Sequence, residues 1–364
     1  MDINKVFQAV TQRGASDLHL CVGLPPIIRL HGDLKHLSDR PLADSDVGGL
    51  LKEILTVEQE NQIRSGKEMD IAGEIKGAGR FRVHIYRDRK GICAAFRLIP
   101  GILQSFEELG LPDAIDKTCW LPNGMVIIAG PAGSGKSTTL ASIIDRINHQ
   151  RSCHIITLED PIEFIHTHKR AVVNQRQIGT HVRSFSAGLR SALREDPDVI
   201  LVGEMRDLET IRMAISAAET GHLVFATLHT RDAAQSVNRV IDVFPSQQQE
   251  QIRVQLSDSL HMVVSQLLIP ARDGGRRYLA TEVLMVNSAV RHLIRGKKAY
   301  QIKAAIENGK REGMHTFEDS LHYLFRQGKV SEQALRYCHD AAQIVNNLKQ
   351  KLDQPIESSG YDFN

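Results

Sequence analysis

The residues best suited to chemistry form a glycine-rich loop that reads GPAGSGKS and fits the pattern G-x-x-x-x-G-K-[ST]. Its glycines permit a tight turn whose backbone N–H groups can face phosphate oxygens, while Lys136 supplies a positive charge and Ser137 offers a hydroxyl to Mg²⁺. A strand-like run precedes the loop and a helix-like run follows it, as this motif requires. The sequence therefore predicts a nucleoside triphosphate site made of Gly130, Pro131, Ala132, Gly133, Ser134, Gly135, Lys136, Ser137 and Thr138.

Carboxylates follow two further strand-like runs. One run ends at Leu158 and leads into Glu163, and another ends at Val202 and leads into Glu204. Open parallel sheets bind ligands at the carboxyl ends of their strands, so we expect these acids beside the phosphate loop. We assign Glu163 to the attacking water and Glu204, with Ser137, to Mg²⁺, directly or through water. The opposite assignment of the two acids stays open.

A histidine closes the next apolar run, which ends in Leu228-His229-Thr230. If this run is another parallel strand, His229 lies at the same edge of the sheet, where it can sense the γ-phosphate or relay its loss. The predicted catalytic set is therefore Lys136, Glu163, Glu204 and His229.

Apolar runs that alternate with helix-like segments in the second part of the chain predict an α/β fold with buried parallel strands. Before residue 100 the pattern is mostly of period two, as in GRFRVHI at 79–85, which predicts a smaller sheet-containing domain. The predicted organisation is an N-terminal domain at 1–98, a linker at 99–118, an ATPase domain at 119–287 and a C-terminal helical region at 288–364.

Local patterns predict several more elements. Turns are expected at 31–33 and 88–91, the second of them within a hairpin. The segment 246–268 has apolar residues close to helical spacing and is predicted as a helix packed on the sheet. Another narrow apolar stripe, at 334–352, predicts a helix near the end of the chain.

Composition excludes several classes of protein. Among 364 residues, 45 Lys and Arg oppose 43 Asp and Glu, and only 5% are aromatic, which argues against a nucleic-acid translocase. The five cysteines form no C-x-x-C pair, which argues against a disulfide framework and a zinc ribbon. The apolar runs are too short to cross a bilayer, so we expect a cytoplasmic protein without a transmembrane segment.

Longer motifs give the sequence a family resemblance. It resembles the type IV pilus retraction ATPases, the PilT and PilU family of the secretion ATPase superfamily, over nearly its whole length. The resemblance rests on GASDLHL at 14–20, GLPP at 23–26, GRFRV at 79–83, the phosphate loop, LEDPIEF at 158–164, the stretch from REDPD to GEMRD at 194–207, and GHLVFATLHT at 221–230.

This resemblance implies an architecture and an activity. The fold would be an N-terminal PAS-like α+β domain joined by a flexible linker to a RecA-like P-loop ATPase domain, with C-terminal helices. Six subunits would form a ring that hydrolyses ATP with Mg²⁺ to power pilus retraction in twitching motility. In such rings arginines of the small domain approach the γ-phosphate, and the matching residues are Arg80 and Arg97. The ring would dock in the cytoplasm at the inner-membrane base of the pilus, on its platform protein, with a paralogous retraction ATPase as a further possible partner.

One motif departs from the family pattern. Retraction ATPases usually carry a stretch close to AIRNLIRE, whereas this chain has AVRHLIRG at 289–296, so that Gly296 replaces the final acid. The missing acid leaves open an accessory PilU-like subunit that assists a paralogous motor. A second alternative, from the same superfamily, is a secretion ATPase that moves another substrate. The absence of paired cysteines argues against the pilus assembly and type II secretion ATPases, which usually carry a zinc motif.

Overall fold

The computed structural model describes residues 2–30, 33–75, 77–99, 101 and 103–333. They form two compact units. The first contains Met1–Leu103 together with Pro161–Ile165, and the second contains Gln104–Asp160 and His166–Asn364, described as far as residue 333. The predicted helix at 334–352 and the first two residues of the predicted turn at 31–33 lie outside the described residues.

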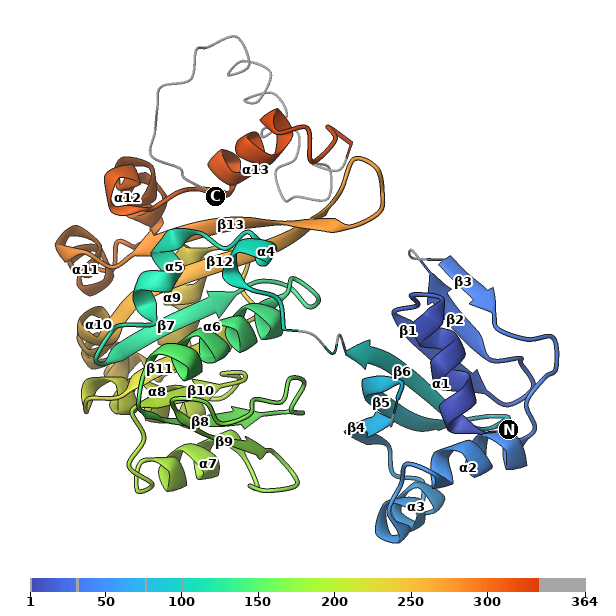
Figure 1. The fold of residues 1–364 in the computed structure, drawn as a ribbon. Helices are drawn as coiled ribbons and strands as arrows, with labels where there is room; N and C mark the ends of the chain where they lie inside the picture. Colours follow the sequence, from blue (N-terminus) through green and yellow to red (C-terminus); the bar gives the residue numbers. More distant parts are fainter. Residues whose placement is uncertain (1, 31–32, 76, 100, 102, 334–364) are drawn as a thin grey trace. The chain divides into compact units, whose positions relative to one another are not determined.

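The first unit is built on a six-stranded antiparallel sheet in the order β3-β2-β1-β6-β5-β4. The helix α1 lies across it in Figure 1. The strands are β1 (Asp17–Cys21), β2 (Ile27–Leu30), β3 (Asp33–His36), β4 (Met69–Ile75), β5 (Gly79–Asp88) and β6 (Gly91–Ile99), and the helices are α1 (Ile3–Gln12), α2 (Asp44–Lys52) and α3 (Val57–Arg64).

Alternation along the strands explains this packing. On β5, Phe81 and Val83 are buried on one face of the sheet. Arg80, the residue before Phe81, lies on the other face and is half-buried. The side chain of Phe7 on α1 meets Phe81 and Phe96, with ring centroids 5.3 Å and 5.0 Å apart. The predicted hairpin at 88–91 is found between β5 and β6. This unit therefore has its own hydrophobic core, as an independent domain requires.

The second unit contains a seven-stranded sheet in the order β13-β12-β7-β11-β10-β8-β9. All neighbours are parallel except β12 and β13. Every residue of β7, β10 and β11 is buried, as expected where helices cover both faces of a parallel sheet. The strands are β7 (Gly124–Ala129), β8 (His154–Glu159), β9 (Val172–Gln177), β10 (Val199–Val202), β11 (Leu223–Leu228), β12 (Leu260–Pro270) and β13 (Arg277–Met285).

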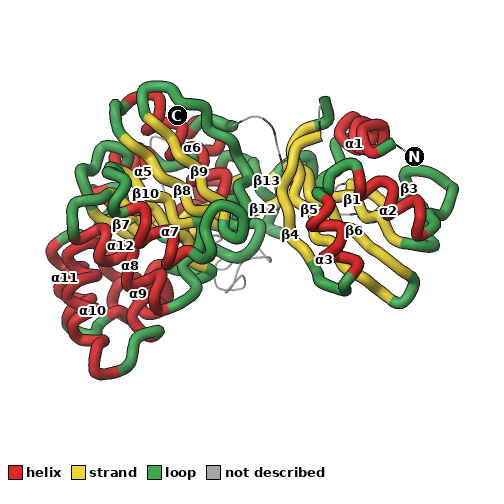
Figure 2. Tube along the Cα trace, turned by 90° about the horizontal axis from the view of Figure 1, so that it is seen from below, coloured by secondary structure: helices red, strands yellow, loops and turns green. Residues whose placement is uncertain are grey.

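Helices pack on both faces of this sheet, and Figure 2 shows its strands between two helical layers. One face is covered by α4 (Phe106–Leu109), α5 (Asp113–Thr118) and α6 (Lys136–Gln150). The other face is covered by α7 (Phe185–Ala192), α8 (Leu208–Glu219), α9 (Ala233–Asp242), α10 (Ser246–Ser259), α11 (Ser288–Arg295) and α12 (Ile302–Asn308). The helix α13 (Phe317–Arg326) packs on β13, and 3-10 turns lie at Ala299–Gln301 and Lys310–Glu312.

Two sequence-based predictions need correction. The predicted helix at 246–268 ends at Ser259, and the chain continues as β12, which pairs with β7 and β13. A short apolar run fits the period of a helix as well as that of a strand. Here hydrogen bonds to β7 and β13 hold the run as a strand. The predicted linker at 99–118 includes α4 and α5, whose Phe106 and Ile115 are buried in the core of the second unit.

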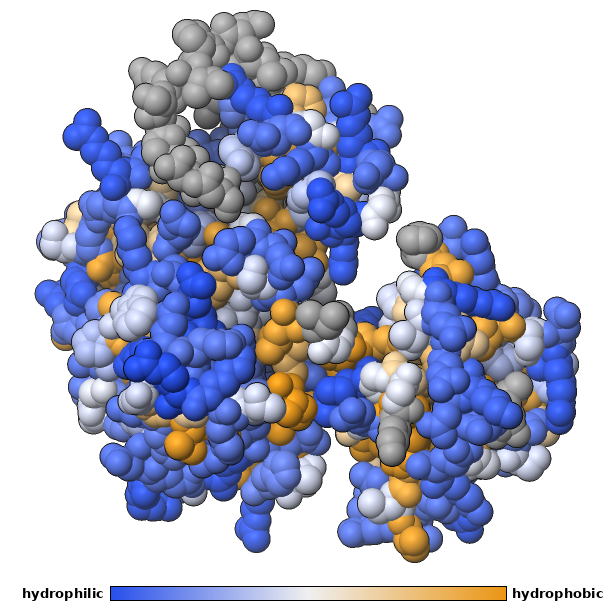
Figure 3. Space-filling view, viewed as in Figure 1, coloured by the Kyte–Doolittle hydropathy of each residue, from blue (hydrophilic) through white to orange (hydrophobic). Residues whose placement is uncertain are grey.

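The surface of the second unit is mainly hydrophilic on the face that Figure 3 shows. Its exposed large apolar residues include Trp120, Val172, Val254 and Tyr300. In the part of the chain that the structure describes, no helix is both long enough and apolar enough to cross a membrane.

Candidate functional site

The predicted site residues of the second unit gather at one edge of its sheet. The strands β7, β11, β10 and β8 are adjacent and parallel, so their carboxyl ends share that edge. The phosphate loop follows β7, Asp160 follows β8, Glu204 lies two residues beyond β10, and His229 follows β11 directly. Topology therefore brings together residues that are up to 99 positions apart in the sequence, as Gly130 and His229 are.

The phosphate loop requires glycine at specific positions. Gly130, Gly133 and Gly135 have φ angles of 148°, 76° and 90°. A Cβ atom on Gly130 would lie only 2.5 Å from the carbonyl oxygen of Gln266 and equally close to Ser134 Oγ. The N-cap of α6 is Gly135, which has no side chain to bond the first amides, so the N–H groups of this turn can bind an anion. These features fit the phosphates of a nucleotide.

The Lys136 side chain is held within the loop. Its Nζ donates hydrogen bonds to the carbonyl oxygens of Gly130, at 2.7 Å, and Pro131, at 3.0 Å. These contacts keep a buried ammonium group solvated by protein dipoles at the position where phosphate oxygens must arrive. Ser137, the next residue, is exposed and can offer its hydroxyl to Mg²⁺.

A buried polar pair braces the loop from β12. Gln266 is fully buried, and its Nε2 donates a 2.8 Å hydrogen bond to Oγ1 of Thr139, which lies in the first turn of α6. This bond connects β12 to the helix that begins the phosphate site. The sequence analysis did not identify Gln266, although a glutamine within the apolar run of β12 was a visible signal.

Glu204 is placed between the side chains of Arg206 and His229. Its Oε1 lies 2.6 Å from Arg206 Nε and 3.3 Å from His229 Nε2. Burial opposes the charged form of Glu204, but the hydrogen bond with Arg206 and the facing His229 outweigh it, so the pKa of Glu204 lies below its usual value. The carboxylate is therefore ionised at neutral pH and suited to a metal ion or a water molecule.

Backbone hydrogen bonds fix the segment that carries Glu204. Gly203 N donates to the carbonyl oxygen of Leu158 at 2.8 Å, and the Thr227 hydroxyl donates to the Gly203 carbonyl oxygen at 2.5 Å. Met205 N donates to the carbonyl oxygen of Thr227 at 3.1 Å. The chain on both sides of Glu204 is thus tied to β8 and β11, which limits its freedom to move away from the site.

The carboxylates that follow β8 differ in their surroundings. Glu159 accepts a 2.6 Å hydrogen bond from the Thr157 hydroxyl and a 3.1 Å bond from Gln175 Nε2. The pKa of Arg206 is raised first by the hydrogen bond that Arg206 donates to Glu204, and the charge of the exposed Asp160 adds to this shift. Glu159 is therefore engaged in the fold, whereas Asp160 extends the negative charge beside Arg206.

The remaining predicted residues lie in the first unit. There, Arg80 donates to the carbonyl oxygens of Ile162 and Glu163, both at 3.1 Å. Arg97 is exposed and donates to Asp17 Oδ1 at 3.1 Å. The roles of Glu163, Arg80 and Arg97 at a nucleotide stay predictions.

Mg²⁺ would depend on few protein ligands. Among the residues that the structure describes, no group of three or more His, Cys, Asp or Glu side chains forms a metal cluster. The donors present, the Ser137 hydroxyl and the Glu204 carboxylate, fit the pattern of P-loop enzymes, in which phosphate oxygens and water complete the coordination of the ion.

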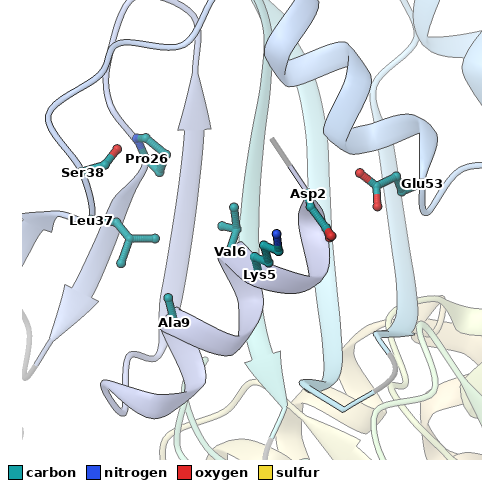
Figure 4. A pocket seen from close by; sticks show the side chains of 8 residues that line it. All are labelled: Asp2, Lys5, Val6, Ala9, Pro26, Leu37, Ser38 and Glu53. Carbon is teal, nitrogen blue, oxygen red and sulfur yellow. The ribbon is translucent and has the colours of Figure 1, made fainter.

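A groove of about 770 Å³ in the first unit is lined by residues that include Asp2, Ser38 and Glu53 (Figure 4). Two of the acids that line it already stabilise the start of α1, because Asp2 accepts from Asn4 N and Glu53 accepts from Ile3 N. The groove therefore has no assigned chemistry.

Comparison with known proteins gives consistent results. The family model described as "Type II/IV secretion system protein" matches residues 1–275. The type IV pilus retraction ATPase PilT of Pseudomonas aeruginosa is 46% identical over 348 residues, which cover 96% of this chain and 100% of PilT. The type IV pilus ATPase PilU of the same species is 35% identical over 350 residues, covering 96% of this chain and 92% of PilU.

A solved structure supports the fold. The crystal structure of the pilus retraction motor PilT with bound ADP has a TM-score of 0.86 and 42% identity, and the match covers 94% of this chain and 98% of that one. The chain therefore belongs to the Type II/IV secretion system protein family, as an ATPase with an N-terminal domain and a RecA-like ATPase domain that resembles the pilus retraction ATPases.

Proposed function

We propose that this chain is the ATP-hydrolysing motor subunit that retracts a type IV pilus. The observation that carries the proposal is the 46% identity to PilT over 96% of the chain, which includes the phosphate loop and the segments around Glu204 and His229. The geometry of the site supports it, because an ionised carboxylate and a histidine lie at the sheet edge where the loop begins.

Each residue has a defined task in this proposal. The loop amides and Lys136 bind the phosphates and neutralise their charge. Ser137 and Glu204 hold Mg²⁺, which would neutralise charge that develops on the transferred phosphoryl group. Glu163 orients or deprotonates the attacking water, or exchanges this task with Glu204. His229, in contact with Glu204, reports whether the γ-phosphate is present.

The motor acts as a ring of six copies. Arg80 and Arg97 approach the γ-phosphate, and the N-terminal domain has a PAS-like fold. The ring works in the cytoplasm at the inner-membrane base of the pilus, where it contacts the platform protein and a paralogous retraction ATPase. ATP binding closes a subunit and product release reopens it, so that hydrolysis becomes movement.

An accessory PilU-like role is the second candidate, favoured by Gly296 in place of the family acid. The motif helix α11 is nevertheless well anchored: Arg291 donates to the Asp258 carbonyl oxygen at 3.0 Å, and Arg295 donates to Ser257 at 2.7 Å and contacts the Asp258 carboxylate. None of these contacts needs an acid at 296. The identity to PilT, 46%, is higher than the 35% identity to PilU, which favours the motor. A secretion ATPase is the third candidate.

Deletion of the gene in its host and complementation test the proposal. The wild-type chain should restore twitching, whereas Lys136→Ala should leave cells with many surface pili that do not retract, because assembly continues without retraction. Arg190→Ala is a matched control, since it removes only an exposed ion pair between α7 and Glu209 on α8, which contributes ~0–1 kcal/mol. Loss of all pili in the deletion strain would indicate assembly instead, and lost secretion with normal twitching would favour the secretion ATPase.

A further inference from the structure

A buried glutamate lies outside the set of residues that the proposed mechanism uses. Glu282 is on β13 and is only 7% exposed. In the sheet register it stands beside Ser265 of β12, which stands beside Ala129, the last residue before the phosphate loop. Glu282 therefore lies on an edge strand of the sheet, in register with the end of β7, where the phosphate loop begins.

Its carboxylate stabilises the beginning of a helix. Glu282 Oε1 accepts a 2.9 Å hydrogen bond from the backbone N–H of Ala233, the first residue of α9. Asp232, the N-cap of α9, accepts a 2.7 Å bond from Gln235 N. The two acids accept hydrogen bonds from different amides of the first turn. Both lie where negative charge interacts favourably with the positive end of the helix dipole.

The helix start that Glu282 holds directly follows the turn that carries His229. The hydroxyl of Thr230 in this turn lies 2.7 Å from the hydroxyl of Ser236 on α9, and Ser236 Oγ donates to the carbonyl oxygen of Asp232 at 2.8 Å. One end of the turn is therefore fixed to β13 through Ala233. At the other end, His229 reaches Glu204.

We propose that Glu282 is a positioning residue for ATP hydrolysis, which holds the turn between β11 and α9 so that His229 faces Glu204. The proposal deepens the proposed function, because it rests on the role of His229 at the phosphate site. Glu282 acts through the backbone of Ala233 and contacts no reacting atom.

The electrostatic surroundings of Glu282 make this support sensitive to pH. Burial raises the pKa of Glu282 to about 7, and Asp232 on α9 and Glu318 on α13 act in the same direction, whereas the Ala233 N–H and Lys303 on α12 oppose the shift. Ionised Glu282 makes a charge-assisted hydrogen bond to Ala233, and protonation leaves a weaker neutral one. The turn should therefore be held more firmly as the pH rises through about 7.

The same titration has the opposite sign for folding. Because the pKa in the fold is above the unfolded value of 4.5, the contribution of Glu282 to stability is complete below pH 4.5 and is lost as the pH rises to about 7. The charged form that supports the turn is thus the form that the fold disfavours. Such a cost is common at sites that serve activity.

Steady-state hydrolysis of Mg-ATP by the full chain, measured from pH 6 to pH 8.5, tests the proposal. The wild-type kcat should rise about 3-fold through pH 7, as a neutral hydrogen bond becomes charge-assisted. Glu282→Gln mimics the protonated acid, so its kcat should stay near the wild-type value at pH 6 without this rise. Glu282→Leu leaves the Ala233 N–H unpaired, so kcat should fall about 10-fold at pH 8 with KM for ATP nearly unchanged.

Asp319→Asn is the matched control, since Asp319 caps α13 through Thr316 and is also partly buried. It should lower thermal stability without changing the pH profile. A Glu282→Leu enzyme with wild-type kcat, or a Glu282→Gln enzyme that keeps the rise, would overturn the proposal. If the wild type itself hydrolyses no ATP, the proposed function fails instead, and the two failures are distinct.

Discussion

The hydrogen bond between Gln266 and Thr139 allows a sharp test of how β12 supports the phosphate loop. Thr139→Val removes the hydroxyl with little change of shape, and Gln266→Leu removes the amide. The native bond is 2.8 Å long and both side chains are buried, so no solvent can replace a missing partner.

The two single substitutions should have unequal effects. Thr139→Val leaves the Gln266 amide buried and unpaired, which costs about 1–3 kcal/mol. Gln266→Leu should cost less, because the Thr139 hydroxyl can turn to a carbonyl of the preceding helical turn. The double variant removes both partners, so it should be less damaging than the sum of the two, with a coupling energy of about 1 kcal/mol.

Thermal unfolding followed by the fluorescence of Trp120 is the assay, because this single tryptophan lies in the second unit. For a unit of this size, 1 kcal/mol shifts Tm by about 2–4 °C, so Thr139→Val should lower Tm by about 2–12 °C. Binding of a fluorescent ADP analogue should weaken in parallel. Additive shifts in the double variant would refute the claim that the pair acts as one connection.

Two further predictions concern the loop and the first unit. Gly130→Ala should abolish binding of the ADP analogue, because its Cβ would lie 2.5 Å from the Gln266 carbonyl oxygen at a φ of 148°, and tight binding by this variant would contradict the loop geometry. Phe96→Ala should destabilise the first unit by about 3–5 kcal/mol, because it empties space next to Phe7 and Phe81, whereas Phe96→Leu should cost less. In limited proteolysis of Phe96→Ala, new cleavage sites should cluster within 1–103, and uniform cleavage along the chain would argue against a separate core.

Much of the site's framework could be predicted because its signals are local. The spacing of glycines, lysine and serine identifies the phosphate loop. The fully apolar runs of β7, β10 and β11 predict parallel strands buried on both faces. Once the strands are parallel and adjacent, the rule for their carboxyl ends places Glu204 and His229 near the loop.

The rest depended on contacts between distant segments. The apolar run of β12 fits either a helix or a strand, and only its pairing with β7 and β13 decides between them. The contact of Arg206 with Glu204 depends on how a short loop turns back, which residue types alone do not specify. Glu282 is visible in the sequence as a carboxylate within an apolar run. Its partner could not be predicted, because Ala233 lies 49 residues away.

The most direct test of the central claim is the ATPase activity of the purified chain beside a Glu204→Ala variant, with particle mass measured by mass photometry in the same samples. We predict that both proteins form particles of six 40.6 kDa chains, about 244 kDa in all, and that only the wild type turns over ATP. Substitution of Glu204 should lower kcat by about 100-fold or more, because the variant loses either its carboxylate ligand for Mg²⁺ or, if Glu204 and Glu163 exchange roles, a positioned acid or base. Wild-type protein that binds ATP without hydrolysing it, or a variant that keeps full turnover, would contradict the account.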